Sequence, residues 1–456
     1  MRIGRRPAWP VVLLISGAIT STGIWAATGL ASARPEHAPP ASVAAATDAS
    51  ADAASLRARL PGEPGGRWPG GVARPEAAGF GFLVGVYCTS RTNCWAVGVQ
   101  GGSGNATLSQ ALHWNGKAWR HVKMPSPGGL NAKTELAAVR CATASACWAV
   151  GYYVRGGATL NAMLRWNGRK WTAMGTPEPA GSGKTSQNEL TDVTCISVRN
   201  CWAVGYFGRV GSTTLDEVLH WNGTKWLRVR VPAPGGTTNV SVNMLNDVRC
   251  PTSSRCLAVG SYSPGTGTHK TFNQALSWAG KSWTAEHAPS PGSSAAHNDA
   301  TLFGLGCGAR NSCWAVGAFG PSSQDKFLSQ VMHWNGRTWS RTPMSQPGGT
   351  GAIALNELGW VTCSSAGNCW AVGTYGQTNP SLELNQAQHW NGRRWVLVHT
   401  PNPAGTATND ENALLSVRCT SGSDCWAVGG AAKAESGTVA DEILHWNGKK
   451  WTIQPA

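Results

Sequence analysis

The fourteen cysteines of the chain form seven pairs, and five residues separate the two members of every pair. Two cysteines at this spacing on adjoining antiparallel strands lie within disulfide reach, whereas a zinc site calls for closer pairs with further ligands. We therefore predict seven local disulfides and neither a metal nor another cofactor. The predicted disulfides join Cys88 to Cys94, Cys141 to Cys147, Cys195 to Cys201, Cys250 to Cys256, Cys307 to Cys313, Cys363 to Cys369 and Cys419 to Cys425.

Acidic residues and histidines are the other side chains whose types could support catalysis. A glycoside hydrolase needs two carboxyl groups that flank the scissile bond, and adjacent acids such as Asp216-Glu217 do not provide them, because neighbours on a strand point to opposite faces. Five histidines share one repeat position, which indicates a structural role. They are His113, His220, His333, His389 and His445. No catalytic motif is present and no group breaks the repeat symmetry as an active site would, so we predict no catalytic residue.

Each cysteine pair belongs to a repeat with a period of 53 to 57 residues, in which Cys-Trp-Ala-Val-Gly precedes Trp-Asn-Gly-x-x-Trp. In the second copy, 136–141, 147–152 and 162–166 are predicted strands, and Trp171 marks a fourth. The Asn167-Gly168 step predicts a type I′ turn, since both residues tolerate positive φ. The repeats occupy residues 79–456 and start near residues 79, 134, 188, 243, 300, 356 and 412.

Four antiparallel strands in each of seven copies predict an all-β fold, a seven-bladed β-propeller with one local disulfide per blade. A solenoid is the alternative architecture. Trp114 and Trp119 have counterparts in all the copies, and we expect these rings to pack between facing blades. The fourth copy has Ala279-Gly280 in place of Asn-Gly and Leu257 in place of tryptophan, so it is predicted to be the most irregular.

The formal net charge is +15, and its placement predicts two different faces of a disc. The first and third turns of a four-stranded blade open on one face, and the middle loop and the link to the next blade open on the other. Candidate polyanion-binding residues at the Asn-Gly turns of the first face are Lys117, Arg169, Lys170, Lys225, Lys281, Arg337, Arg393, Arg394, Lys449 and Lys450. Acids predicted on loops of the opposite face are Glu135, Glu178, Glu189, Asp216, Glu217, Asp325, Glu383, Glu411, Asp441 and Glu442. A basic face would attract polyanions, and the alternative interpretation is that these charges only maintain solubility.

The N-terminal residues predict export. Arg2, Arg5 and Arg6 precede an apolar stretch from Val11 to Leu30, and the small residues 31–33 follow it, which is typical of a signal peptide spanning 1–33. An uncleaved apolar segment that anchors the protein close to the membrane is the alternative. Residues 34–78 are rich in Ala, Pro and Gly and are predicted to form a flexible linker.

The Cys-Trp-Ala-Val-Gly element of residues 94–98 and its counterparts, together with the His-Trp-Asn-Gly-x-x-Trp of residues 113–119, 333–339, 389–395 and 445–451, resemble the secreted CWAVG-repeat β-propeller proteins of high-GC Gram-positive bacteria. This resemblance covers all seven copies. More distantly, the Gly-x-x-Trp end is similar to the Asp-box of sialidase-like propellers and to the repeats of photosystem II assembly factors. The Ser-x-Asp-x-Gly start of an Asp-box is missing, so the resemblance implies a fold more firmly than an activity.

These observations together predict a secreted, non-catalytic binding or scaffold module at the cell surface, which we expect to be a monomer. Its partner would be an anionic cell-wall polymer, a glycan or an extracellular protein. Nucleic acid is not expected as a partner because of the export signal. A glycan-active hydrolase of the Asp-box type is the alternative function, and a structural wall protein is the third.

Overall fold

The computed structural model describes residues 80–456 except 105, 239, 266–269, 294–297, 322–325, 379–380 and 435–437. This part of the chain folds into 28 β-strands and contains no helix. The predicted signal peptide and linker lie outside the described residues.

The strands form seven consecutive four-stranded units. Units 1 to 3 contain β1 (Gly81–Ser90), β2 (Asn93–Gly101), β3 (Thr107–Trp114) and β4 (Trp119–His121); β5 (Thr134–Thr143), β6 (Ala146–Arg155), β7 (Ala158–Trp166) and β8 (Trp171–Ala173); and β9 (Ser186–Ser197), β10 (Asn200–Arg209), β11 (Thr214–Trp221) and β12 (Trp226–Arg228). Units 4 and 5 contain β13 (Val242–Thr252), β14 (Arg255–Ser263), β15 (Lys270–Trp278) and β16 (Trp283–Glu286); and β17 (Asn298–Ala309), β18 (Ser312–Gly320), β19 (Leu328–Trp334) and β20 (Trp339–Arg341). Units 6 and 7 contain β21 (Ala354–Ser365), β22 (Asn368–Thr378), β23 (Ser381–Trp390) and β24 (Trp395–Val398); and β25 (Glu411–Ser421), β26 (Asp424–Ala432), β27 (Val439–Trp446) and β28 (Trp451–Ile453).

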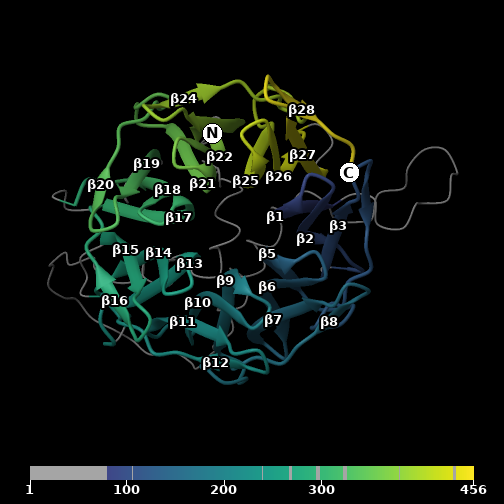
Figure 1. The fold of residues 1–456 in the computed structure, drawn as a ribbon, viewed down its shortest axis with the longest axis vertical. Helices are drawn as coiled ribbons and strands as arrows, with labels where there is room; N and C mark the ends of the chain where they lie inside the picture. The colour runs from purple at the N-terminus through teal and green to yellow at the C-terminus, as the bar shows by residue number, and fades with distance from the viewer. Residues whose placement is uncertain are drawn as a thin grey trace, which may run out of the picture.

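The seven units are arranged in a ring, with the first strand of each unit nearest the centre and the short fourth strand at the circumference (Figure 1). Successive strands within a unit pair in antiparallel fashion, and Cys363 lies opposite Cys369 in the β21–β22 register. The structure contains all seven predicted disulfides, one in each unit. The glycine after each Cys-Trp-Ala-Val lies against the first strand: a Cβ on Gly373 would stand 2.0 Å from the Glu357 carbonyl oxygen, which explains why only glycine occurs there.

Unit 1 packs directly on unit 7, so the two ends of the described chain meet. Phe80 forms a parallel bridge with Val439, and the Gln110 Nε2 atom donates a hydrogen bond to Asp441 Oδ2 over 2.6 Å. The strands of unit 1 and those of unit 7 each come from one continuous segment. No strand is therefore exchanged between these two units within the described residues, and the Phe80–Val439 bridge and side-chain contacts join them.

Tryptophan triads fill the interfaces between units, as the sequence predicts. At the interface of units 6 and 7, the ring of Trp370 lies 4.8 Å from that of Trp446 and 5.2 Å from that of Trp451. Equivalent triads occupy every other interface except that of units 4 and 5. There, buried Leu257 replaces one ring and packs in the same cluster as the two tryptophans of unit 5.

The Asn-Gly turns differ from the type I′ turn predicted. Only the glycine has positive φ, and four residues separate the paired tryptophans, as in the pairing of Trp390 with Trp395. The Asn391 Oδ1 atom accepts hydrogen bonds from two backbone N–H groups of the turn, those of residues 393 and 394. Asparagine is thus used for its side-chain oxygen. The fourth unit, predicted to be irregular, keeps the same turn, because Gly280 alone supplies the left-handed conformation at φ +89°.

Candidate functional site

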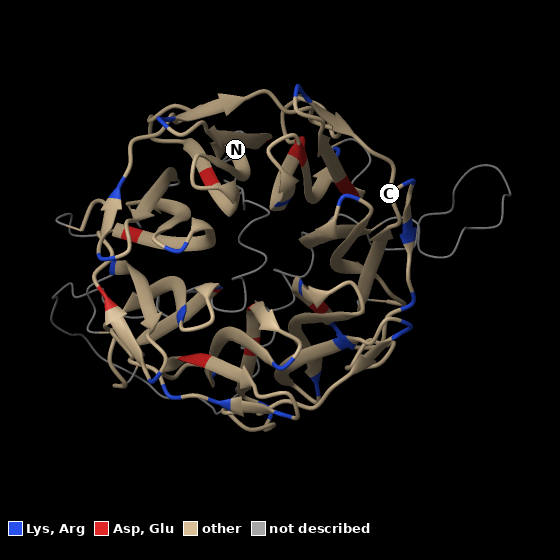
Figure 2. Ribbon diagram, viewed as in Figure 1, with Lys and Arg blue, Asp and Glu red and all other residues tan. Residues whose placement is uncertain are grey.

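The predicted polyanion-binding residues lie at exposed turn tips on one face of the ring. In three units, the turn between the cysteines contacts the Asn-Gly turn through a tryptophan. The indole Nε1 atoms of Trp114, Trp221 and Trp446 donate to the carbonyl oxygens of Arg91, Val198 and Gly422 over 3.0, 3.2 and 3.3 Å. We call the face that carries both kinds of turn the Cys-turn face. All ten residues are exposed: Lys117, Arg169, Lys170, Lys225, Lys281, Arg337, Arg393, Arg394, Lys449 and Lys450. Each unit supplies one or two of them, and lysine and arginine accordingly recur around the circumference (Figure 2).

The prediction of an acidic opposite face is wrong, because all but one of the described acids lie within strands, and Glu178, on the link between β8 and β9, is not exposed either. Asp325 is outside the described residues, and none of the other nine acids is exposed. The exposed fractions are 3% for Glu189, 5% for Asp216, 0% for Glu217, 1% for Glu383 and 1% for Glu442. The opposite face therefore carries no ring of exposed carboxylates from these residues.

Several buried acids instead link neighbouring units. Two successive residues on the third strand of a unit point to the two neighbouring units, where an amide side chain meets the carboxyl group. The Asn161 Nδ2 atom donates to Glu217 Oε1 over 2.9 Å, and Asn385 donates to Glu442 in the same way. Burial raises the pKa of Glu442 to about 8 and that of Glu217 well above its usual range. These carboxyl groups hold the ring together and present no charged surface.

The recurring histidines have the structural role that their shared position predicts. The ring of His389 lies 4.5 Å from that of Trp370, and His220 packs 4.3 Å from Trp202 in the same way. Burial lowers the pKa of both imidazoles. No group of acids, histidines or cysteines that could hold a metal ion is found in the described part of the chain.

A cluster of charged residues that the sequence analysis missed lies at the centre of the ring. Arg140, Arg249 and Arg418 each directly precede the first cysteine of their unit, and Asp192 and Asp247 lie three residues before it. We call these five residues the axial cluster. They come from the first strands β5, β9, β13 and β25, and they occupy these repeat positions in only some units. The expectation that nothing breaks the repeat symmetry is therefore wrong.

Ion pairs hold the acidic part of the axial cluster. The Nη1 atom of Arg249 lies 2.5 Å from Asp192 Oδ2 and 2.6 Å from Asp247 Oδ1. The Nη2 atom of Arg140 lies 3.6 Å from the other oxygen of Asp192. A backbone N–H, that of Leu305, also donates to Asp247 Oδ2 over 2.8 Å. Both carboxyl groups are fully buried, so these contacts replace the water they have lost.

Two aromatic rings from other units pack on the arginines. The Cζ atoms of Arg140 and Arg249 lie 5.2 Å and 5.3 Å from the ring centre of Trp360, which therefore contacts both guanidinium groups. The Cζ atom of Arg418 lies 4.5 Å from the ring centre of Tyr87. Such cation–π contacts fix the direction of a guanidinium group without neutralising its charge.

The two carboxyl groups of the cluster have opposite pKa shifts. Burial, reinforced by the negative charge of Asp192, raises the pKa of Asp247 well above its usual range. Burial also acts against ionisation of Asp192, but Arg249 and Arg140 outweigh it and lower its pKa. A hydrogen bond joins the two carboxyl groups, so each affects the ionisation of the other.

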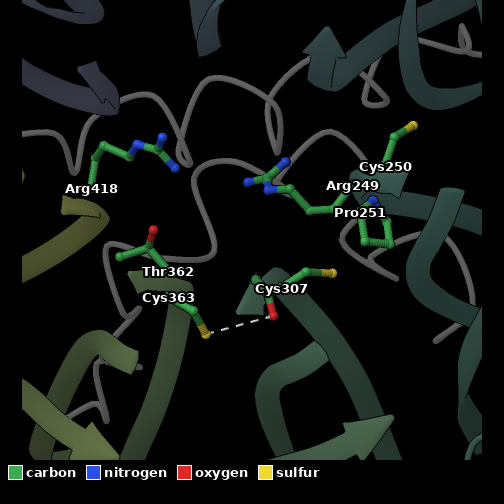
Figure 3. A pocket seen from close by; sticks show the side chains of 8 residues that line it. Arg249, Cys250, Pro251, Cys307, Thr362, Cys363 and Arg418 are labelled. Carbon is green, nitrogen blue, oxygen red and sulfur yellow. Dashed lines mark hydrogen bonds between the residues drawn. The ribbon is translucent and has the colours of Figure 1, made fainter. Parts of the chain in front are cut away.

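A cavity of about 130 Å³ opens beside the cluster, at the cysteine-bearing ends of the first strands. The guanidinium groups of Arg249 and Arg418 extend towards each other from units 4 and 7, and the hydroxyl group of Thr362 lies below Arg418 (Figure 3). Cys250, Cys307 and Cys363 also line this cavity, which places it on the Cys-turn face. The exposed basic turns and the axial arginines therefore belong to the same face.

The opposite ends of the first strands carry a second polar group with little space around it. Glu189 lies close to Tyr206, and Glu135 close to Tyr152, beside a space of about 20 Å³. Burial raises the pKa of Glu189 to about 8 and raises the pKa of Tyr206 well above its usual value. A hydroxyl group so far from ionisation is a poor nucleophile, and the space holds little more than one water molecule.

Comparisons with known proteins identify no family and no activity. No protein-family model matches the chain, and no curated protein matches it. Among solved structures, the GH74 xyloglucanase from Xanthomonas campestris is similar over 82% of this chain at 15% identity and a TM-score of 0.49, and the chain spans only 55% of that protein. The β-propeller domain of the Trilobed protease from Pyrococcus furiosus is similar over 83% of this chain and 98% of its own length, at 9% identity and a TM-score of 0.46. A PL25 ulvan lyase is similar over 84% of this chain and 98% of its own length, at 10% identity and a TM-score of 0.45. Likenesses of this strength carry no argument about what the chain binds or does.

Proposed function

We propose that the chain is a seven-bladed β-propeller that acts outside the cell as a non-catalytic binding module. The ring of seven four-stranded units, with unit 1 packed on unit 7, supports the propeller. Seven disulfides and no free cysteine in the described residues support an oxidising, extracellular location, together with the signal-peptide pattern of the N-terminus. No helix with the length and apolarity to cross a membrane occurs among the described residues.

The proposed ligand is an anionic polymer of the cell wall, bound on the Cys-turn face. The observation that carries this proposal is the exposure of all ten predicted basic residues on that face, while none of the nine predicted acids that the structure describes is exposed. Many weak contacts between turn tips and a flexible polyanion would add up through multivalency. A neutral glycan or an extracellular protein would instead use the loops of the opposite face, which differ from unit to unit.

The test is co-sedimentation of the purified protein with isolated Gram-positive cell walls across a salt series. We expect binding that weakens steeply with salt, because exposed charges are screened within about 10 Å at roughly 0.1 M salt. Replacing Arg393, Arg394, Lys449 and Lys450 together by glutamine should greatly reduce it.

The chain offers a matched control with the same loss of charge. Lys133, Arg155, Lys184 and Arg209 are exposed on the loops and links of the opposite face, and their replacement by glutamine should leave wall binding unchanged. Equal losses from the two variants would show that net charge alone matters, and unchanged binding by the first variant would reject the proposal.

A glycan-active hydrolase is the second candidate. The observation that favours it is the Asp192–Asp247 pair beside the axial cavity, since two carboxyl groups with opposed pKa shifts can act as acid and base. It ranks second because the pair is hydrogen-bonded, closer than the roughly 5 Å that separates the carboxyl groups of retaining enzymes. Turnover of a chromogenic glycoside that is lost in Asp247→Asn would favour this candidate over binding alone.

A further inference from the structure

The axial cluster contains more positive than negative charge. Three guanidinium groups, those of Arg140, Arg249 and Arg418, accompany two carboxyl groups. Even with both carboxyl groups ionised, the cluster keeps one positive charge in excess. Unbalanced charge at a partly buried site is costly unless a counter-ion enters it.

Arg418 is the arginine of the cluster that has no acidic partner among the described residues. Its Cζ atom lies over the ring of Tyr87, and its buried Nε atom has no hydrogen-bond partner among the described residues. The charged group that lowers its pKa, after burial, is another arginine, Arg249. Two guanidinium groups that face each other across a cavity repel unless an anion lies between them.

The cavity between them has the size and the donors for a small oxyanion. Its volume of about 130 Å³ has room for several water molecules, since roughly 10–15 Å³ of such space holds one. Hydrogen-bond donors reach it from three units: Arg249 from unit 4, Thr362 from unit 6 and Arg418 from unit 7. A carboxylate presents its acceptor atoms in one plane, whereas the oxygens of a tetrahedral ion point in all directions.

We propose that this cavity binds the phosphate or sulfate group of a ligand, held by the guanidinium groups of Arg249 and Arg418 and by the hydroxyl group of Thr362. This proposal rests on the proposed function, because the bound group would be part of the same anionic polymer. The arginines are already oriented before the ligand arrives. Asp192 and Asp247 hold Arg249, and Tyr87 packs on Arg418, so little ordering remains for the ligand to impose.

The test is calorimetric titration of the purified protein with inorganic phosphate and inorganic sulfate at constant ionic strength, with acetate as a parallel ligand. We expect one phosphate or sulfate per chain and weaker binding of acetate. Arg418→Gln should weaken phosphate binding by about tenfold to a hundredfold, the effect of losing one charge-assisted donor. Arg393→Gln removes an exposed arginine of the same face and should not change it.

Absence of saturable phosphate and sulfate binding, acetate binding as tight as phosphate, or full affinity in Arg418→Gln would each overturn the proposal. If Arg418→Gln does not fold by far-ultraviolet circular dichroism, Thr362→Val takes its place, with weaker phosphate binding expected and unchanged affinity counting against the site. A parallel titration with glycerol phosphate identifies the source: affinity equal to that of phosphate indicates a group carried by a polymer, and binding of inorganic phosphate alone indicates the free ion.

The two proposals fail separately. If the protein binds phosphate but not cell walls, the anionic wall polymer is rejected as its partner and the axial site stands. Salt-dependent wall binding without phosphate or sulfate binding would reject the axial site and keep the exposed basic turns as the binding surface.

Discussion

Glu442 provides a quantitative test of the links between units. It is 1% exposed, it accepts a hydrogen bond from Asn385 of unit 6, and its pKa is raised to about 8 by burial. The pKa of Glu442 is higher in the folded than in the unfolded protein. Its contribution to the free energy of unfolding is therefore fully present below about pH 4.5 and is lost as the pH rises through about 8. The free energy of unfolding falls by about 1.4 kcal/mol for each unit of pH above 4.5, so at pH 7 it is lower by about 3 kcal/mol.

Replacing Glu442 by glutamine removes the titration and keeps the shape. The chain already contains the resulting contact, because Gln330 occupies the same repeat position and exchanges two hydrogen bonds with Asn273, over 2.8 Å and 3.0 Å. We expect Glu442→Gln to equal the wild type in stability at about pH 4 and to exceed it by about 3 kcal/mol at pH 7. The measurement is urea-induced unfolding, followed by tryptophan fluorescence, from about pH 4 to about pH 8.5.

The reverse change is the matched control. Gln330→Glu places a carboxyl group opposite Asn273 and removes the amide donor to the Thr301 and Ala318 carbonyl oxygens at every pH. Its loss of stability should grow by about a further 3 kcal/mol between pH 4 and pH 7. The reasoning would be refuted if the difference in stability between Glu442→Gln and the wild type did not change with pH.

Three further predictions concern the packing, the turns and the disulfides. Trp370→Ala should destabilise the protein by about 3–5 kcal/mol, and Trp370→Leu by less, because Leu257 fills the equivalent place at the interface of units 4 and 5; thermal unfolding of both variants tests the order. Asn391→Ala should cost about 1 kcal/mol, since two backbone N–H groups lose their acceptor, and an equal stability in chemical denaturation would contradict the role given to asparagine. Removing the disulfide of unit 4 by Cys250→Ser and Cys256→Ser should cost about 2 kcal/mol with little change in circular dichroism, because its loop is short, and loss of the whole fold would contradict a local role.

Features set by neighbours in sequence could be predicted before the structure. The cysteine spacing leads to the disulfide, and alternating apolar residues mark the strands, because both depend on contacts within one hairpin. The packing of the tryptophans between units was also predictable, since a large ring repeated at one position has no other place to be buried. The turn type could not be predicted, because Asn-Gly suits two kinds of turn. The asparagine can adopt a positive φ, or its side-chain oxygen can accept hydrogen bonds from the backbone, and only the backbone conformation shows which of these occurs.

The axial cluster could not be predicted in the same way, because its residues come from four different units and meet only when the ring forms. The sequence does contain a signal: Arg140, Arg249 and Arg418 stand beside cysteines in otherwise apolar strands, where arginine is rare without a partner. The acids were misplaced for a related reason. Their partners are amides of the neighbouring unit, such as Asn385 for Glu442, and no pattern within one repeat shows that contact.

The junction of units 1 and 7 has a consequence for the order of the chain. Each unit is one continuous segment, and Phe80 lies beside Val439 without a shared strand. A peptide that joined the end of β28 to Phe80 would make the described backbone a closed loop, which could then be opened at any link between two units. Circular permutants that begin at different links should therefore fold into the same ring. The folded structure would then not depend on which unit is encoded first.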